Sequence, residues 1–340
     1  MIERLYFMIK QLPIAEPPKL SHQFLALPLS IIMTNENMWG WYYSEFIQMY
    51  THRDLDDNIF VRTYNNLFLE RYDPLECIQI SPFKLKLGKD IIEFFKMMIN
   101  NQYYIYTFCD KFYIKILNIN HHMNHDILIY GYDDNLKSFK AYVYKGNWLD
   151  KVNITYDEFI LSYNSDFFED NFTMLYRKKD RNFDINLEKI KWHLLDYIEG
   201  VNTFNRECAN ERPQLSTKWG VDVYDEMLKM YKRNFENNDS FNIAETYCFY
   251  EHKKDMLDRV VFLNESSPIK CTDEIIGNLK LIKEESLVVV NKLLKCKLTG
   301  FNDTSNTLNS ITKYFNKMKV LEFDVLNLYY KNNKNVFEEI

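Results

Sequence analysis

The chain has 340 residues, of which 46% are hydrophobic and 16% aromatic, and its formal net charge is -6 at pH 7. This size and composition predict two ordinary folded domains, with cores or a groove rich in Tyr and Phe. The acidic balance, the short basic runs and the lack of any GxGxxG or GxxxxGK[ST] pattern argue against nucleic-acid and nucleotide binding.

The first half of the chain predicts an α+β domain. Residues 21–33 form an apolar segment that indicates a loop entering a buried helix, with Pro28 in its first turn, and helices are expected over 41–50 and 88–100. Residues 103–109, 125–132 and 138–144 predict strands, and Asp133-Asp134-Asn135 predicts a hairpin turn between the last two. Residues 155–163 predict a helix that packs back on this sheet.

The second half predicts an α-helical domain. Its periodicity is clearest over residues 187–197, 221–234, 243–263 and 273–294, which are separated by turns rich in Asn and Ser. The expected domains are therefore residues 1–180 and 181–340. Six cysteines without CxxC spacing, and no segment typical of a signal peptide or membrane span, predict a reduced cytoplasmic protein without a membrane partner.

The most informative stretch begins at His125, which opens a buried strand that a Gly131-Tyr132-Asp133 turn is expected to close. This stretch resembles the histidine strand of the C39-like cysteine peptidases and, more closely, of the butirosin biosynthesis protein H N-terminal family. The segments LSII (29–32), WYYSEFIQ (41–48), DKFYI (110–114), WGVDVY (219–224) and YEHKKDML (250–257) extend the resemblance to stand-alone amide synthetases of clostridial thiotemplated peptide pathways, of the closthioamide type. It implies a papain-like domain with an N-terminal nucleophile helix and an antiparallel sheet.

A papain-like site needs a thiolate at a helix N-terminus, where the helix dipole lowers the pKa of the thiol, and an imidazole on a facing strand. The family's spacing has a small residue four positions after the nucleophile and aliphatic residues five and seven positions after it. Ser30, Ile31 and Met33 match these places, which puts the nucleophile position at Ala26. Alanine cannot attack an acyl carbon.

Several interpretations of Ala26 stay open. An alanine is expected here if a cysteine has been replaced to inactivate the enzyme. It is equally expected in a natural pseudoenzyme, or if position 26 is an ordinary helix residue. A shift in register moves the position to Leu25 or Leu27. Cys109 is the alternative nucleophile because it lies close in sequence to the histidine strand, although its apolar surroundings are typical of an inert buried thiol.

The catalytic imidazole also needs an acceptor that orients it. The strand after His125 carries no Asp or Asn, so Asp110, at the end of the preceding strand, is the expected orienting residue, and Asn147 is the alternative. Asp110 is equally well read as a turn residue. Gln23 is a candidate donor to an oxyanion, although polar residues in such loops more often cap backbone groups.

Two other groups of residues have a competing interpretation. His121, His122 and His125 lie close together, but neighbouring residues of an extended segment point in different directions and no HExxH pattern occurs, so no metal site is expected. His252 is expected to be solvated or to cap a helix, with a role in the active site left open by the resemblance.

The resulting hypothesis is acyl transfer from a carrier-protein thioester to a small amine, with a cysteine at position 26 as nucleophile and His125 moving the proton. The phosphopantetheine arrives with the carrier protein, so no resident cofactor is expected, and the sequence also allows a homo-oligomer. A C39-like cysteine peptidase and a non-catalytic scaffold are the alternatives. The aromatic excess further predicts a substrate channel between the two domains.

Overall fold

The computed structural model describes residues 8–54, 58–64, 72–80, 90–146, 148–165, 173–207, 218–237, 243–300 and 304–339. The chain has an α+β fold and forms two compact units, one of Met1–Glu36 with Leu67–Asn182 and one of Asn37–Asn66 with Phe183–Ile340. The change of unit after Asn182 lies close to the expected boundary at residue 180. The segment 37–66, which the sequence places in the first domain, belongs to the second unit.

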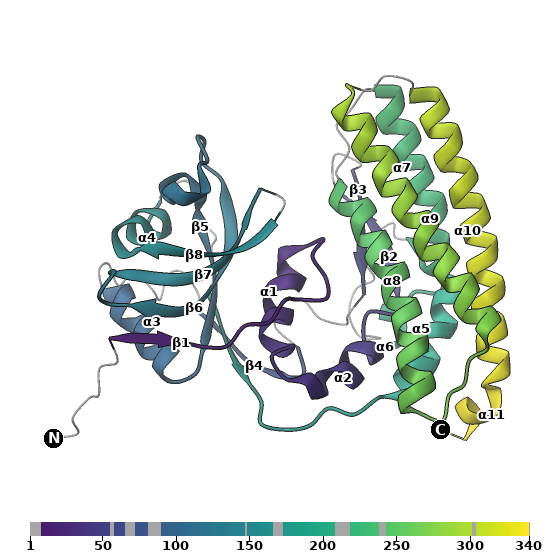
Figure 1. The fold of residues 1–340 in the computed structure, drawn as a ribbon, viewed down its shortest axis with the longest axis horizontal. Helices are drawn as coiled ribbons and strands as arrows, with labels where there is room; N and C mark the ends of the chain where they lie inside the picture. Colours follow the sequence, from purple (N-terminus) through teal and green to yellow (C-terminus); the bar gives the residue numbers. More distant parts are fainter. Residues whose placement is uncertain are drawn as a thin grey trace. The chain divides into compact units, whose positions relative to one another are not determined.

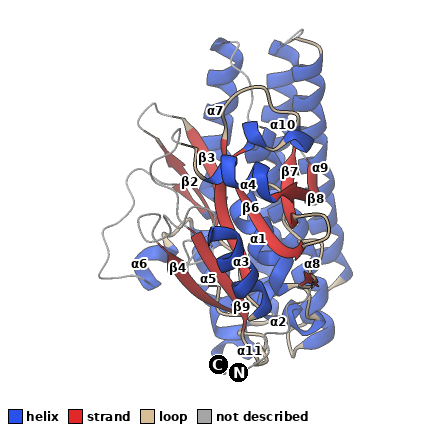
Figure 2. Cartoon of the chain, turned by 90° about the vertical axis from the view of Figure 1, so that its left-hand side faces the viewer, coloured by secondary structure: helices blue, strands red, loops and turns tan. Residues whose placement is uncertain are grey.

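The first unit is built on an antiparallel sheet, shown in Figure 2. Its main path runs β4-β9-β5-β6-β7-β8, and β1 pairs with β6 off this path. The strands are β1 (Ile9–Gln11), β4 (Leu75–Ile80), β5 (Tyr104–Asp110), β6 (Asn124–Asp133), β7 (Ser138–Lys145), β8 (Trp148–Thr155) and β9 (Thr173–Lys178). The three strands that the sequence predicts are thus β5, β6 and β7, and the predicted hairpin joins β6 to β7.

Gly131 is part of a strand and not of a turn, in contrast to the expectation for Gly131-Tyr132-Asp133. It lies in β6 next to an irregularity in the β6–β7 register and opposite Gln11 of β1. A Cβ atom at this position would lie 2.6 Å from the main-chain oxygen of Lys10. Glycine is therefore required by the close approach of β1, and the chain turns only after Asp133.

Helices cover both faces of this sheet (Figure 1). The helices α3 (Asp90–Asn100) and α4 (Tyr156–Tyr163) lie on one face, where Phe95, Phe139 and Phe159 form a cluster of ring contacts. Thr155 and Glu158 form a capping box that starts α4 one residue after the predicted position. The helix α1 (Gln23–Ile32) lies on the other face, and eight of its residues are buried.

Pro28 lies inside α1 and not in its first turn, because the helix already begins at Gln23. Proline has no N–H group, so the carbonyl of Phe24 loses its usual helical partner. The hydroxyl of Tyr72 donates a hydrogen bond to that carbonyl at 3.0 Å. A side chain from elsewhere in the unit thus replaces the missing helical bond.

The second unit combines long helices with a small sheet of order β10-β2-β3. The long helices are α5 (Leu187–Glu199), α7 (Val223–Asn237), α8 (Ile243–Ser266), α9 (Asp273–Leu298) and α10 (Thr304–Asn332), as predicted for this half of the chain. The strands are β2 (Met49–Arg53), β3 (Ile59–Thr63) and β10 (Lys218–Trp219), and the short helices are α2 (Trp39–Ser44), α6 (Thr203–Glu207) and α11 (Lys334–Glu338). In the described part of the chain, no helix has the length and apolarity needed to span a membrane.

The helix predicted over residues 41–50 is wrong in its second half. The helix α2 ends at Ser44, Phe46 adopts a left-handed backbone with φ 54°, and β2 begins at Met49. The buried guanidinium of Arg259 donates to the carbonyls of Tyr43 and Glu45, at 2.8 Å each. This tertiary interaction satisfies carbonyls that a longer helix would use, and no local pattern signals it.

Candidate functional site

The N-terminus of α1 meets the histidine strand through Gln23 and His125. Gln23 is the first residue of α1, and its Nε2 lies 3.2 Å from Nε2 of His125 on β6. An amide nitrogen only donates, so with this orientation Nε2 of the ring accepts and the ring proton lies on Nδ1. The basic atom of the imidazole therefore faces the beginning of α1, and the His125 side chain keeps 19% of its surface exposed.

A buried carboxylate lies on the other side of the imidazole. Nδ1 of His125 is 3.1 Å from Oδ1 of Asp126 and 3.3 Å from the main-chain oxygen of Asp126, and the latter contact has hydrogen-bond geometry. Oδ2 of Asp126 accepts a hydrogen bond from the hydroxyl of Tyr106 at 2.5 Å. Burial, and then the charge of Asp126, raise the pKa of Tyr106 well above its usual value, so Tyr106 stays a donor.

Asp110 does not contact His125, although the sequence predicts it as the orienting residue. Its carboxylate pairs with Nδ1 of His122 at 2.5 Å and accepts bonds from Ser165 and from the main-chain nitrogens of Phe112 and Met123. Burial alone would raise the pKa of Asp110, but these hydrogen bonds lower it. Asp126 makes the contact expected of Asp110, because the β5–β6 register places Asp110 opposite Asn124.

The position predicted for the nucleophile lies inside the core. Ala26 exposes 0% of its surface, and the neighbouring Leu25 and Leu27 are buried as well. Gln23 lies three residues earlier, on the same side of the helix, and only partly buried. Gln23 therefore provides the polar contact between α1 and the base, at 3.2 Å.

The alternative nucleophile is unreactive by its surroundings. Cys109 lies directly opposite His125 in the β5–β6 register, but it is fully buried. Burial raises the pKa of Cys109 to about 12, so the thiolate is nearly absent at neutral pH. Cys77, on β4, is the other thiol among the described residues of the first unit.

The histidine cluster is divided by its partners. His122 turns to Asp110 and packs against Phe112, whereas His125 faces Gln23 and Asp126. Within the described ranges, no group of three or more His, Cys, Asp or Glu side chains could hold a metal ion. Asn147, the alternative orienting residue, lies outside the described residues.

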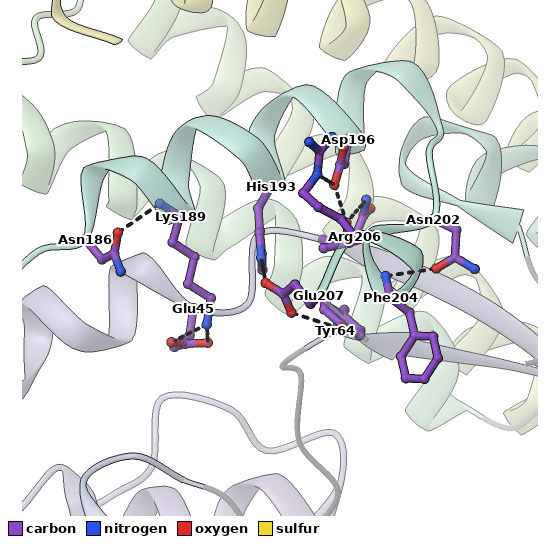
Figure 3. Close-up of polar contacts among 12 residues, drawn as sticks. Glu45, Tyr64, Asn186, Lys189, His193, Asp196, Asn202, Phe204, Arg206 and Glu207 are labelled. Carbon is purple, nitrogen blue, oxygen red and sulfur yellow. Dashed lines mark hydrogen bonds and ion pairs between the residues drawn. The ribbon is translucent and has the colours of Figure 1, made fainter. Parts of the chain in front are cut away.

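A second polar cluster lies in the second unit and was not predicted from the sequence (Figure 3). His193 of α5 pairs with Glu207 of α6 at 2.6 Å, and Glu207 also accepts a bond from Tyr64. Lys189 binds both carboxylate oxygens of Glu45, at 2.7 and 2.6 Å. These pairs link α5 to α6 and to the segments that flank the small sheet, which is a structural role.

His252 also has a structural role, and the prediction that it is solvated or capping is wrong. Its side chain is fully buried, its Nε2 lies 2.7 Å from the main-chain oxygen of Ile47, and its ring stacks on Tyr197. The neighbouring Lys253 forms a fully buried ion pair with Glu322 at 2.7 Å. The sequence of α8 looks charged, but its residues His252 and Lys253 are buried in the core of the second unit.

The chain matches no protein-family model and no curated protein sequence.

Proposed function

We propose that this chain has a papain-like fold and takes part in the transfer of acyl groups from carrier-protein thioesters to amines. It binds the carrier-bound acyl group beside His125 but forms no acyl-enzyme. The observation that carries this proposal is the contact between Nε2 of Gln23 and Nε2 of His125, at 3.2 Å. A thiol acyltransferase needs a sulfur atom in that place. Here the helix terminus presents an amide to the imidazole.

The chemistry of the neighbouring groups supports binding without covalent transfer. The Gln23 amide is a donor suited to an acyl oxygen, and Nε2 of His125 is an acceptor suited to an amine. The pKa of Cys109, raised to about 12 by burial, argues against this thiol as a substitute nucleophile. The order of the motifs that resemble carrier-dependent amide synthetases supports a carrier protein as the partner and a small amine as the second substrate.

The proposal is tested with an acyl group on the phosphopantetheine of a carrier protein and a small amine. Fluorescence anisotropy measures binding, intact-mass spectrometry detects an acyl adduct on the chain, and chromatography with mass spectrometry detects the amide. We expect binding without adduct or amide, and a roughly tenfold higher Kd for His125→Ala, in line with the loss of one or two hydrogen bonds.

The matched control is His122→Ala, which removes the neighbouring imidazole that pairs with Asp110. It should leave the Kd unchanged. An acyl adduct or amide formed by the chain as written would show that it is an active enzyme. Absence of binding would remove the acyl-transfer proposal altogether.

A further inference from the structure

Tyr106, Asp126 and His125 form a continuous chain of contacts behind the candidate site. The Tyr106 hydroxyl is 2.5 Å from Oδ2 of Asp126, and Oδ1 of Asp126 is 3.1 Å from Nδ1 of His125. We propose that Tyr106 and Asp126 are positioning residues, which hold the His125 ring with its proton on Nδ1 and its basic Nε2 toward α1.

Burial makes this arrangement more than incidental packing. Asp126 is 2% exposed, and a buried carboxylate is costly unless its oxygens are paired. Within the described part of the chain, Oδ1 of Asp126 accepts no hydrogen bond, and Nδ1 of His125 lies 3.1 Å from it as a polar neighbour. The Tyr106 hydroxyl occupies the other oxygen, Oδ2, and Lys111 and Cys109 are further titratable groups that interact with Asp126.

The sheet fixes Tyr106 in the required place. Asp126 lies opposite Phe108 in the β5–β6 register, so Tyr106, two residues before Phe108, is its diagonal neighbour on the same face. The Tyr106 ring makes edge contacts with Phe108 and Tyr176. The hydroxyl is therefore held by a rigid, buried side chain.

The test uses the whole chain without substrate. Nitrogen-15 NMR of the histidine ring nitrogens reports the ratio of the Nδ1–H to the Nε2–H tautomer of His125. We expect Tyr106→Phe to lower this ratio roughly two- to tenfold, the range that the net contribution of one hydrogen bond gives. The same substitution in an Asp126→Asn background should have no further effect.

The matched control is Tyr104→Phe, which removes a buried hydroxyl two residues earlier on the same strand, bonded to the carbonyl of Pro13. It should leave the ratio unchanged. An unchanged ratio in Tyr106→Phe, or an equal change in both backgrounds, overturns the proposal. If Tyr106→Phe does not fold, Asp126→Asn alone decides, since an unchanged ratio there also overturns it.

This inference concerns the site of the proposed function and rests on it for any role in acyl transfer. The two can fail separately. If the NMR experiment shows the coupled change of the tautomer ratio but no acyl group binds, the proposed function is wrong. The assignment of Tyr106 and Asp126 as positioning residues then still stands.

Discussion

The side-chain nitrogen of Gln23 lies 3.2 Å from Nε2 of His125, although 102 residues separate them in the sequence. The first residue of α1 therefore faces the imidazole, and the residue one turn later, Ala26, is enclosed in the core. Position 23 therefore becomes a second candidate for the nucleophile, beside the predicted position 26.

A cysteine at position 23 should be the reactive thiol of an altered chain. We expect Gln23→Cys to react with iodoacetamide roughly tenfold faster than Ala26→Cys, Cys77 or Cys109, because the helix terminus and His125 lower the pKa of a thiol there. Peptide mapping after timed alkylation measures this. The preference should disappear in a His125→Ala background. A faster reaction of Ala26→Cys would show that position 26 is the nucleophile position, as predicted from the sequence.

The acid that supports His125 can be identified in the same altered chain. In Gln23→Cys, Asp126→Asn should slow alkylation several-fold, because the imidazolium that stabilises the thiolate loses its neighbouring charge. Asp110→Asn should leave the rate unchanged, since Asp110 pairs with His122. The opposite order of the two effects would return the orienting role to Asp110.

The buried amine of Lys111 makes stability depend on alkaline pH. Burial lowers the pKa of Lys111 from 10.5 to about 8, so the unfolded chain binds more protons between these values. The free energy of unfolding therefore gains a contribution that rises with pH in this window, by at most about 1.4 kcal/mol per pH unit. Below pH 8 the lowered pKa is a constant cost of folding.

Urea unfolding at pH 8 to 10 checks this contribution. Lys111→Met should show a shallower rise of the free energy of unfolding with pH than the parent chain. Lys151→Met, at an exposed position of β8, is the control and should keep the parent slope. Parallel curves for Lys111→Met and the parent would contradict the prediction.

The hydroxyl of Tyr72 should stabilise α1 only as long as Pro28 is present. Tyr72→Phe leaves the carbonyl of Phe24 without this donor and should lower the free energy of unfolding by about 1–3 kcal/mol. Pro28→Ala supplies an N–H group for the same carbonyl, so Tyr72→Phe should cost less in that background. Urea unfolding of the four chains measures the coupling, and strict additivity would show that the two groups act independently.

The buried pair of Lys253 and Glu322 should be costly to break on one side. Lys253→Met leaves Glu322 as an uncompensated buried charge and should lower the free energy of unfolding by about 3–5 kcal/mol. The double variant Lys253→Met with Glu322→Leu should recover most of this loss. Thermal and urea unfolding measure both, and an equally unstable double variant would contradict this account.

Local patterns were sufficient for most elements of the fold. The apolar spacing at residues 88–100 and the β-rich runs around Tyr106 and His125 correspond to α3, β5 and β6, because periodicity reflects which side of an element is buried. The strands β1, β2, β3, β4, β8, β9 and β10 were missed. The strands β2 and β3 are short and pair with each other, whereas β4 and β9 pair across a long stretch of the sequence that no local pattern spans.

The sequence by itself determined the α+β class and the position of His125 at the start of a buried strand. Only the tertiary structure decided that Gln23 faces the imidazole, that Asp126 and not Asp110 accompanies it, and that residues 37–66 belong to the second unit. The physical reason is that strand register, the start of a helix and the direction of a side chain depend on contacts between residues far apart in the chain, whereas hydrophobic periodicity is local.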